Sequence, residues 1–95
     1  MKYLWKLKYA ESALKKLKEL SKKNPKLVET TLNYLDEIAK LDNPRSRGKA
    51  LSYNLAGFWR YRVGDFRIIC DINNREFIIT AVNIDHRSKI YNIKK

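Results

Sequence analysis

The spacing of polar and apolar residues changes along the chain, and the first stretch alternates. Tyr3, Trp5, Leu7 and Tyr9 fall on one side of residues 3–9, and lysines fall on the other, with Leu4 as the exception. Strict alternation is typical of a strand with one buried face. The sequence therefore begins with a predicted half-buried strand.

Two helices are expected next. From Ala10 onward apolar residues recur at helical spacing, and lysines occupy the positions between them. Asn24 and Pro25 end this helix and start a second one that runs to about Leu41, because asparagine is a favoured N-cap and proline a favoured first residue. The predicted buried positions are Ala10, Ala13, Leu14, Leu17 and Leu20 in the first helix, and Val28, Thr31, Leu32, Leu35, Ile38 and Ala39 in the second.

After a polar connection at residues 42–48, which is expected to be an exposed loop, the period becomes two. Three strands are predicted at residues 58–63, 66–72 and 77–84, joined by tight turns. The last strand is almost entirely apolar, as expected of a central strand covered on both faces. The result is one α+β domain over residues 1–95. It has the order β-α-α-β-β-β, an antiparallel-rich sheet packed against an N-terminal helical hairpin, and a short C-terminal segment.

Charge indicates the kind of partner. The 95 residues include 21 Lys+Arg and 10 Asp+Glu, a formal net charge of +11. This excess favours a polyanionic partner such as nucleic acid, an acidic protein or a membrane surface, and a lysine-rich soluble surface is the alternative. All seven arginines lie at or after residue 45, so we expect phosphate chemistry in that part of the chain.

The inventory of metal ligands and targeting signals is poor. Cys70 and His86 are the only residues of their types, so we expect no disulfide, no metal site and no cofactor. Cys70 is expected in the core. The alternating charges at the amino terminus exclude a secretory signal, and no stretch is apolar enough to span a membrane. These features predict a cytoplasmic protein without a membrane partner.

An anion site is predicted on the second hairpin. If its turn has two residues, Arg62 lies opposite Arg67, with Arg60 on the same side. Facing like charges destabilise a sheet by roughly 0.2 to 1 kcal/mol, whereas a phosphate between them would accept charge-assisted hydrogen bonds. The alternatives are that Asp71 or Asp85 neutralises the cluster, or that the arginines extend into water.

Three further polar residues follow the last strand, namely His86, Arg87 and Tyr91. Metal-free RNA cleavage needs a base for the 2′-hydroxyl, positive charge for the phosphate and an acid for the leaving oxygen. His86 suits either proton-transfer role near neutral pH, and Tyr91 is a weaker acid. Taken alone, each has a structural alternative, a surface or capping histidine and a tyrosine packed on its sheet.

Several motifs together resemble the RelE/ParE toxin superfamily, specifically its RelE/StbE-like branch. They are Trp5, residues 13–17 (ALKKL), Asn43-Pro44, residues 48–51 (GKAL), residues 58–69 (FWRYRVGDFRII) and residues 86–91 (HRSKIY). The likeness covers nearly the whole chain, and its most specific part is the hairpin block in combination with the late His-Arg and Tyr.

The resemblance implies the toxin of a type II toxin–antitoxin module. Such a toxin is a ribosome-dependent, metal-independent endoribonuclease, or mRNA interferase, which uses the RNA 2′-hydroxyl, cuts messenger RNA in the decoding site and inhibits translation. The implied partners are the ribosome, mRNA and a cognate antitoxin, through which the complex binds operator DNA. The alternatives are a ParE-like, non-enzymatic inhibitor of DNA gyrase and a basic nucleic-acid-binding module.

The resemblance also implies roles for individual residues. The expected catalytic residues are Arg60, Arg62, Arg67, His86, Arg87 and Tyr91, and the expected RNA-binding residues are Arg45, Arg47 and Lys49. Arginine stands on the first hairpin strand where the best-known member has lysine. Because arginine is a poor general base, we expect these side chains to stabilise charge rather than to abstract a proton.

Overall fold

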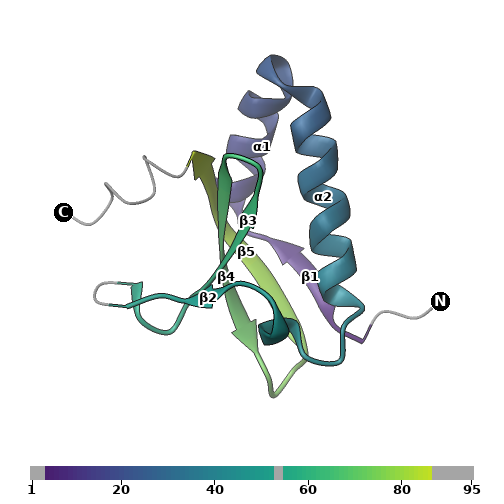
Figure 1. Cartoon of the computed structure of the whole chain (residues 1–95), viewed down its shortest axis with the longest axis vertical. Helices are drawn as coiled ribbons and strands as arrows, with labels where there is room; N and C mark the ends of the chain where they lie inside the picture. The colour runs from purple at the N-terminus through teal and green to yellow at the C-terminus, as the bar shows by residue number, and fades with distance from the viewer. Residues whose placement is uncertain (1–3, 53–54, 87–95) are drawn as a thin grey trace.

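The sheet and the helices form two layers in the computed structural model, which describes residues 4–52 and 55–86 (Figure 1). The elements in chain order are β1 (Lys6–Tyr9), α1 (Glu11–Lys23), α2 (Pro25–Ala39), the 3-10 turn η1 (Pro44–Ser46), β2 (Lys49–Ala50), β3 (Trp59–Val63), β4 (Phe66–Asn73) and β5 (Ile78–His86). The predicted α+β class and the helical hairpin that follows the first strand are confirmed.

The five strands lie in the order β1-β5-β4-β3-β2. β1 runs parallel to β5, and every other neighbouring pair is antiparallel. β5 therefore lies inside the sheet, between β1 and β4, as its apolar sequence predicted. A bulge where Ile69 and Cys70 pair with β5 shifts the register of the two strands.

Capping and packing explain the helical hairpin. The Asn24 side chain accepts a hydrogen bond from the Leu27 backbone N–H at 3.2 Å, and Pro25 begins α2. Thr31 is fully buried in α2, and its hydroxyl donates to the Leu27 carbonyl at 2.8 Å, so the helix itself satisfies this polar group. No helix among the described residues is long and apolar enough to cross a membrane.

The core lies between the helices and one face of the sheet. Its fully buried large side chains include Leu35, Ile38, Tyr61, Phe66, Ile68, Ile79 and Ile84, and Cys70 lies among them, as expected. Leu14 was expected in this core, but it is 52% exposed. α1 buries only the narrow stripe of Ala13, Leu17 and Leu20, and Leu14 lies outside that stripe.

The connection at residues 42–48 is more ordered than an exposed loop. Pro44 is buried, and its carbonyl accepts a 2.6 Å hydrogen bond from the Tyr61 hydroxyl. The Trp59 indole N–H donates to the Arg47 carbonyl, also at 2.6 Å. Gly48 then leads into β2, which the sequence did not predict because two residues are too few to show a period.

Gly48 lets this connection lie directly against β3. It has a φ of +81°, and a Cβ at this position would collide with the backbone carbonyl oxygen of Arg60. Gly48→Ala should therefore lower the free energy of unfolding by about 3 kcal/mol, through backbone strain together with the clash. Urea unfolding followed by circular dichroism measures this loss.

Gly57→Ala is the matched control. Gly57 also has a positive φ, +97°, but a Cβ there meets nothing within 4 Å. We expect a loss of only about 1 kcal/mol from strain alone. Equal losses in the two variants would contradict the close approach of Gly48 to β3.

Candidate anion site on the helix-free face of the sheet

The hairpin of β3 and β4 has the predicted register. Val63 pairs with Phe66 across the two-residue turn, and Arg62 pairs with Arg67. Gly64 has a φ of +59°, whereas Asp65 is not among the residues with positive φ, as in a type II′ turn. The two arginines therefore lie directly opposite each other, as the sequence indicated.

Four basic residues share the face of the sheet that points away from the helices. Antiparallel partners point to the same side, and Lys49 pairs with Arg60 as Arg62 pairs with Arg67. We call Lys49, Arg60, Arg62 and Arg67 the basic face. Arg62 and Lys49 are exposed and Arg60 is half-buried, so the site extends over three strands.

Arg67 differs from its neighbours because it is buried. Its side chain was expected on an exposed surface, but the residue is only 5% exposed. Its Nε and Nη1 atoms are shielded from solvent and have no hydrogen-bond partner within residues 4–52 and 55–86. Buried donors without partners are rare in folded proteins, because each loses its hydrogen bonds to water without replacement. This guanidinium therefore has two free donors suited to an oxyanion.

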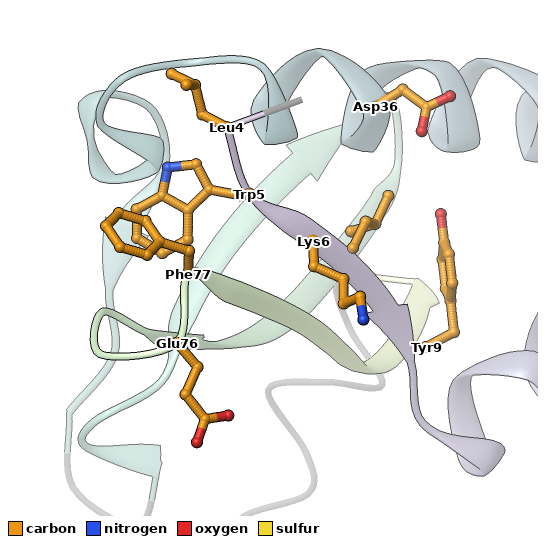
Figure 2. Close-up of a pocket in the computed structure, with 8 residues that line it drawn as sticks. Leu4, Trp5, Lys6, Tyr9, Asp36, Glu76 and Phe77 are labelled. Carbon is orange, nitrogen blue, oxygen red and sulfur yellow. The ribbon is translucent and has the colours of Figure 1, made fainter. Parts of the chain in front are cut away.

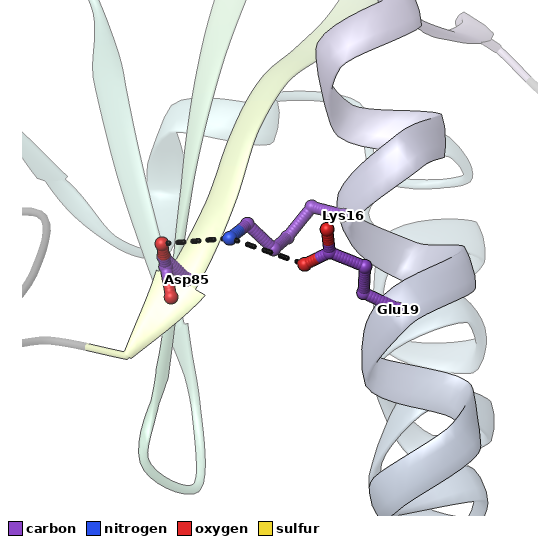
Figure 3. Close-up of polar contacts among 3 residues, drawn as sticks. All are labelled: Lys16, Glu19 and Asp85. Atoms are coloured by element: carbon purple, nitrogen blue, oxygen red, sulfur yellow. Dashed lines mark ion pairs between the residues drawn. The ribbon is translucent and has the colours of Figure 1, made fainter.

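Asp71 and Asp85 are the carboxylates of the alternative interpretation, and within the described residues neither forms an ion pair with Arg67. Asp85 is its register partner on β5, but the Asp85 Oδ2 atom lies 3.4 Å from the Lys16 Nζ on α1 (Figure 3). Asp71 is exposed on β4. Among residues 4–52 and 55–86, no ion pair joins Arg67 to an acidic side chain.

Lys16 is one of the lysines between the apolar positions of the first helix, which were expected to point into solvent, and its contact with Asp85 was not predicted. Its side chain is 29% exposed and bridges to β5 because α1 runs alongside that strand. No periodicity in the sequence reports which lysine of a helix reaches a neighbouring strand.

The arginines of the η1 region are held by contacts within the chain. Arg45 donates to the Asn74 side chain at 2.7 Å and to the Ile72 carbonyl at 3.3 Å. Arg47 lies 3.3 Å from Glu37 and over the Tyr34 ring. Of the three expected RNA-binding residues, the structure joins Lys49 alone to the basic face.

Of the remaining expected catalytic residues, His86 lies at the end of the described chain. His86 is the last residue of β5 and pairs in register with Phe66, one position from Arg67. Arg87 and Tyr91 lie outside the described residues.

A hollow of about 630 Å³ beside β1 has a different character (Figure 2). Trp5 and Phe77 meet there edge to face, with ring centroids 5.1 Å apart. Asp36 and Glu76 contribute negative charge to its lining. Burial, reinforced by Asp36, raises the pKa of Tyr9 to about 12, so this hydroxyl remains protonated. The hollow is therefore a poorer site for an anion than the basic face.

Other kinds of chemistry find little support among the described residues. There, no three His, Cys, Asp or Glu side chains gather as metal ligands. Burial raises the pKa of Cys70 to about 12, which keeps the thiol protonated and unreactive. The unpartnered donors of Arg67 are the strongest chemical feature of this part of the chain.

Comparison with known proteins agrees with the fold. The chain matches, over residues 7–91, the family model described as the ParE toxin of type II toxin–antitoxin system, parDE. No curated protein sequence matches it significantly.

Three solved structures show how widely the fold is shared. The chain is similar to the toxin–antitoxin complex RelBE2 from Mycobacterium tuberculosis, with a TM-score of 0.78 and 20% identity over 93% of this chain and 97% of that one. The archaeal RelE–RelB complex from Pyrococcus horikoshii is similar with a TM-score of 0.67 and 21% identity, over 90% of this chain and 98% of that one. YafQ from E. coli is similar with a TM-score of 0.67 and 16% identity, over 93% of this chain and 99% of that one.

The raised pKa of Cys70 predicts its reactivity. Near pH 8 the native thiol should resist a disulfide reagent, whereas the unfolded thiol, with a pKa near 8.5, should react readily. Because unfolding lowers this pKa from about 12, the contribution of Cys70 to stability should fall as the pH rises above the unfolded value. Labelling followed by mass spectrometry, with and without denaturant, measures the reactivity. Rapid labelling of the native protein would contradict the buried position.

Proposed function

The chain belongs to the RelE/ParE superfamily of toxins from type II toxin–antitoxin systems, and we propose that it is a ribosome-dependent endoribonuclease. In this proposal the toxin cuts messenger RNA and so inhibits translation. The observation that carries it is the buried guanidinium of Arg67, which belongs to the same basic face as Arg60 and Arg62. Its Nε and Nη1 have no hydrogen-bond partner among the described residues.

Arg67 binds the scissile phosphate in the proposed reaction. Two donors of a planar fork suit two phosphate oxygens, and each such hydrogen bond is about twice as strong as a neutral one. The donors are shielded in the free chain, so phosphate binding includes a local movement of the groups over them. Once bound, the phosphate lies where water screens the positive charge weakly, which favours stabilisation of the transition state.

The other residues of the site stabilise charge, contact the RNA backbone and transfer protons in this proposal. Arg60 and Arg62 add positive charge around the pentavalent phosphate, and Lys49 extends the contact along the RNA backbone. Arginine does not take the proton from the 2′-hydroxyl. We assign proton transfer to His86 and Tyr91, with Arg87 as a further cation. The products are a 2′,3′-cyclic phosphate and a free 5′-hydroxyl.

A ParE-like inhibitor of DNA gyrase is the second candidate, and the description of the matching family model favours it. An inhibitor that only binds gyrase has no need for a buried arginine with two unsatisfied donors. The free donors of Arg67 therefore favour cleavage. DNA damage on expression, with intact messenger RNA, would identify the gyrase inhibitor.

Replacement of Arg67 tests the phosphate site. Arg67→Ala should lower the rate of mRNA cleavage on programmed ribosomes by roughly 10²- to 10³-fold, the usual loss when one transition-state contact is removed. The melting temperature should not fall, because the variant loses a buried group with two unsatisfied donors. Primer extension on the cleaved mRNA and thermal unfolding measure the two effects.

Arg75→Ala is the control for this experiment. Arg75 is exposed in the turn between β4 and β5, and its loss removes the same charge without touching the basic face. It should leave both cleavage and stability close to wild type. Full activity of Arg67→Ala, or a loss explained by unfolding, would reject the phosphate assignment.

We place the antitoxin on the helices. A groove of about 520 Å³ is lined by apolar side chains of α1 and α2 and by Tyr9. Leu14 and Leu32 contribute to its lining, with Lys15 and Lys18 beside them. An amphipathic antitoxin segment with apolar residues on one side and acidic residues on the other fits this combination. This binding site accounts for the exposure of Leu14.

A charge in the groove should separate neutralisation from toxicity. Leu14→Glu places a carboxylate at an exposed position, so the fold should persist and the toxin should stay active. Its antitoxin should bind at least about tenfold more weakly, through lost apolar contact and repulsion of acidic residues. Titration calorimetry at two salt concentrations measures the affinity and the electrostatic part of it.

Leu4→Glu is a suitable comparison, because Leu4 is 49% exposed but lies outside this groove. It should bind the antitoxin as the wild type does. Unchanged affinity of Leu14→Glu would place the antitoxin elsewhere, and affinity independent of salt would reject the electrostatic contribution.

A further inference from the structure

Asp85 lies between two cations that belong to different elements. It pairs in register with Arg67 of β4, so both side chains point to the helix-free face. On its other side is α1, whose Lys16 lies 3.4 Å from the Asp85 carboxylate (Figure 3). The carboxylate therefore lies near an amine of α1 and a guanidinium of β4.

The course of α1 brings Lys16 to this place. The pairing of β1 with β5 ends at Tyr9 and Ala81, which leaves the last part of β5 without a strand on that side. α1 runs along this part, and Ser12 of α1 donates a 2.8 Å hydrogen bond to the Val82 carbonyl. Lys16, one helical turn further on, lies within reach of Asp85.

The charges in this region leave one fact to explain. Asp85 is shielded, with its side chain 15% exposed, and its register partner Arg67 has unpartnered donors at Nε and Nη1. Attraction between opposite charges is strong where solvent is scarce, so the carboxylate would be drawn to these donors. Competition from Lys16, which lies 3.4 Å from the Asp85 carboxylate, explains why the Nε and Nη1 donors of Arg67 have no partner.

We propose that Lys16 is a positioning residue for the anion site. By holding the Asp85 carboxylate at the α1 side, it keeps that carboxylate off Arg67 and leaves the guanidinium open for a phosphate. Lys16 itself touches no RNA in this scheme. The inference rests on the anion-binding role that the proposed function gives to Arg67.

Binding of inorganic phosphate to the purified toxin tests the inference. Lys16→Met keeps the length of the side chain and removes its charge, so Asp85 should turn to Arg67. Phosphate affinity should then fall about tenfold, within the usual coupling between contacting residues. In the same variant without phosphate, the NMR resonance of the Arg67 Nε–H should shift, because Asp85 now accepts from it. Arg67→Lys assigns that resonance.

Asp85→Asn distinguishes positioning from a purely structural ion pair. Added to Lys16→Met, it should restore phosphate affinity and return the Nε–H resonance to its wild-type position, since the competing charge is gone. Alone, it should bind phosphate at least as tightly as wild type. Asp85→Asn alone also tests the proposal if Lys16→Met fails to fold, because weaker phosphate binding by Asp85→Asn would overturn it.

Lys22→Met controls for net charge, since Lys22 is exposed on the same helix and its loss has the same formal effect. It should leave phosphate affinity near the wild-type value. Equal weakening by Lys16→Met and Lys22→Met, an unshifted Nε–H resonance, or failure of Asp85→Asn to rescue would each reject the positioning role.

These measurements involve neither ribosome nor mRNA, so the two proposals can fail separately. If Arg67→Ala still cleaves mRNA while the phosphate affinities follow the expected pattern, the assignment of Arg67 to the scissile phosphate is wrong and the role of Lys16 in anion binding stands. If Arg67→Ala abolishes cleavage and Lys16→Met binds phosphate normally, the role of Lys16 alone is wrong.

Discussion

The register of the β3–β4 hairpin, which pairs Arg62 with Arg67, is the constraint on which the rest of the structure depends. The register that brings these like charges together also turns Tyr61 and Ile68 into the core. A shift by one residue would exchange the two faces, exposing the apolar side chains and burying the arginines against the helices. Core packing therefore fixes the basic face, and the repulsion within that face is tolerated as a consequence.

Burial of Arg67 adds a second unfavourable contribution to the free energy of the folded state, besides the repulsion between the arginines. A guanidinium with two unsatisfied donors costs free energy, and the surrounding core offsets that cost. An oxyanion relieves the same cost, so part of the binding free energy comes from the destabilised free state. The fold sets the position of the guanidinium before any ligand arrives, so in the proposed reaction the reorganisation on binding is confined to the groups that cover its donors.

Local rules account for what the sequence predicted well. The Gly64-Asp65 turn fixes the hairpin register, and Asn24 with Pro25 fixes the join between the helices, so both follow from neighbouring residues alone. The burial of Arg67 and the contact between Lys16 and Asp85 depend on how α1 packs beside β5. No local pattern encodes that packing. Alternation placed the arginines on one face but could not tell a buried position from an exposed one.

α1 connects the two surfaces to which we assign function. Leu14 lies in the groove proposed for the antitoxin, and Lys16, two positions along the same helix, holds Asp85 beside the anion site. Residues two apart on a helix point in clearly different directions, so one rigid element can serve both surfaces without sharing a side chain. A displacement of α1 on antitoxin binding would move both residues together. Neutralisation can therefore act on the geometry of the site as well as by covering it.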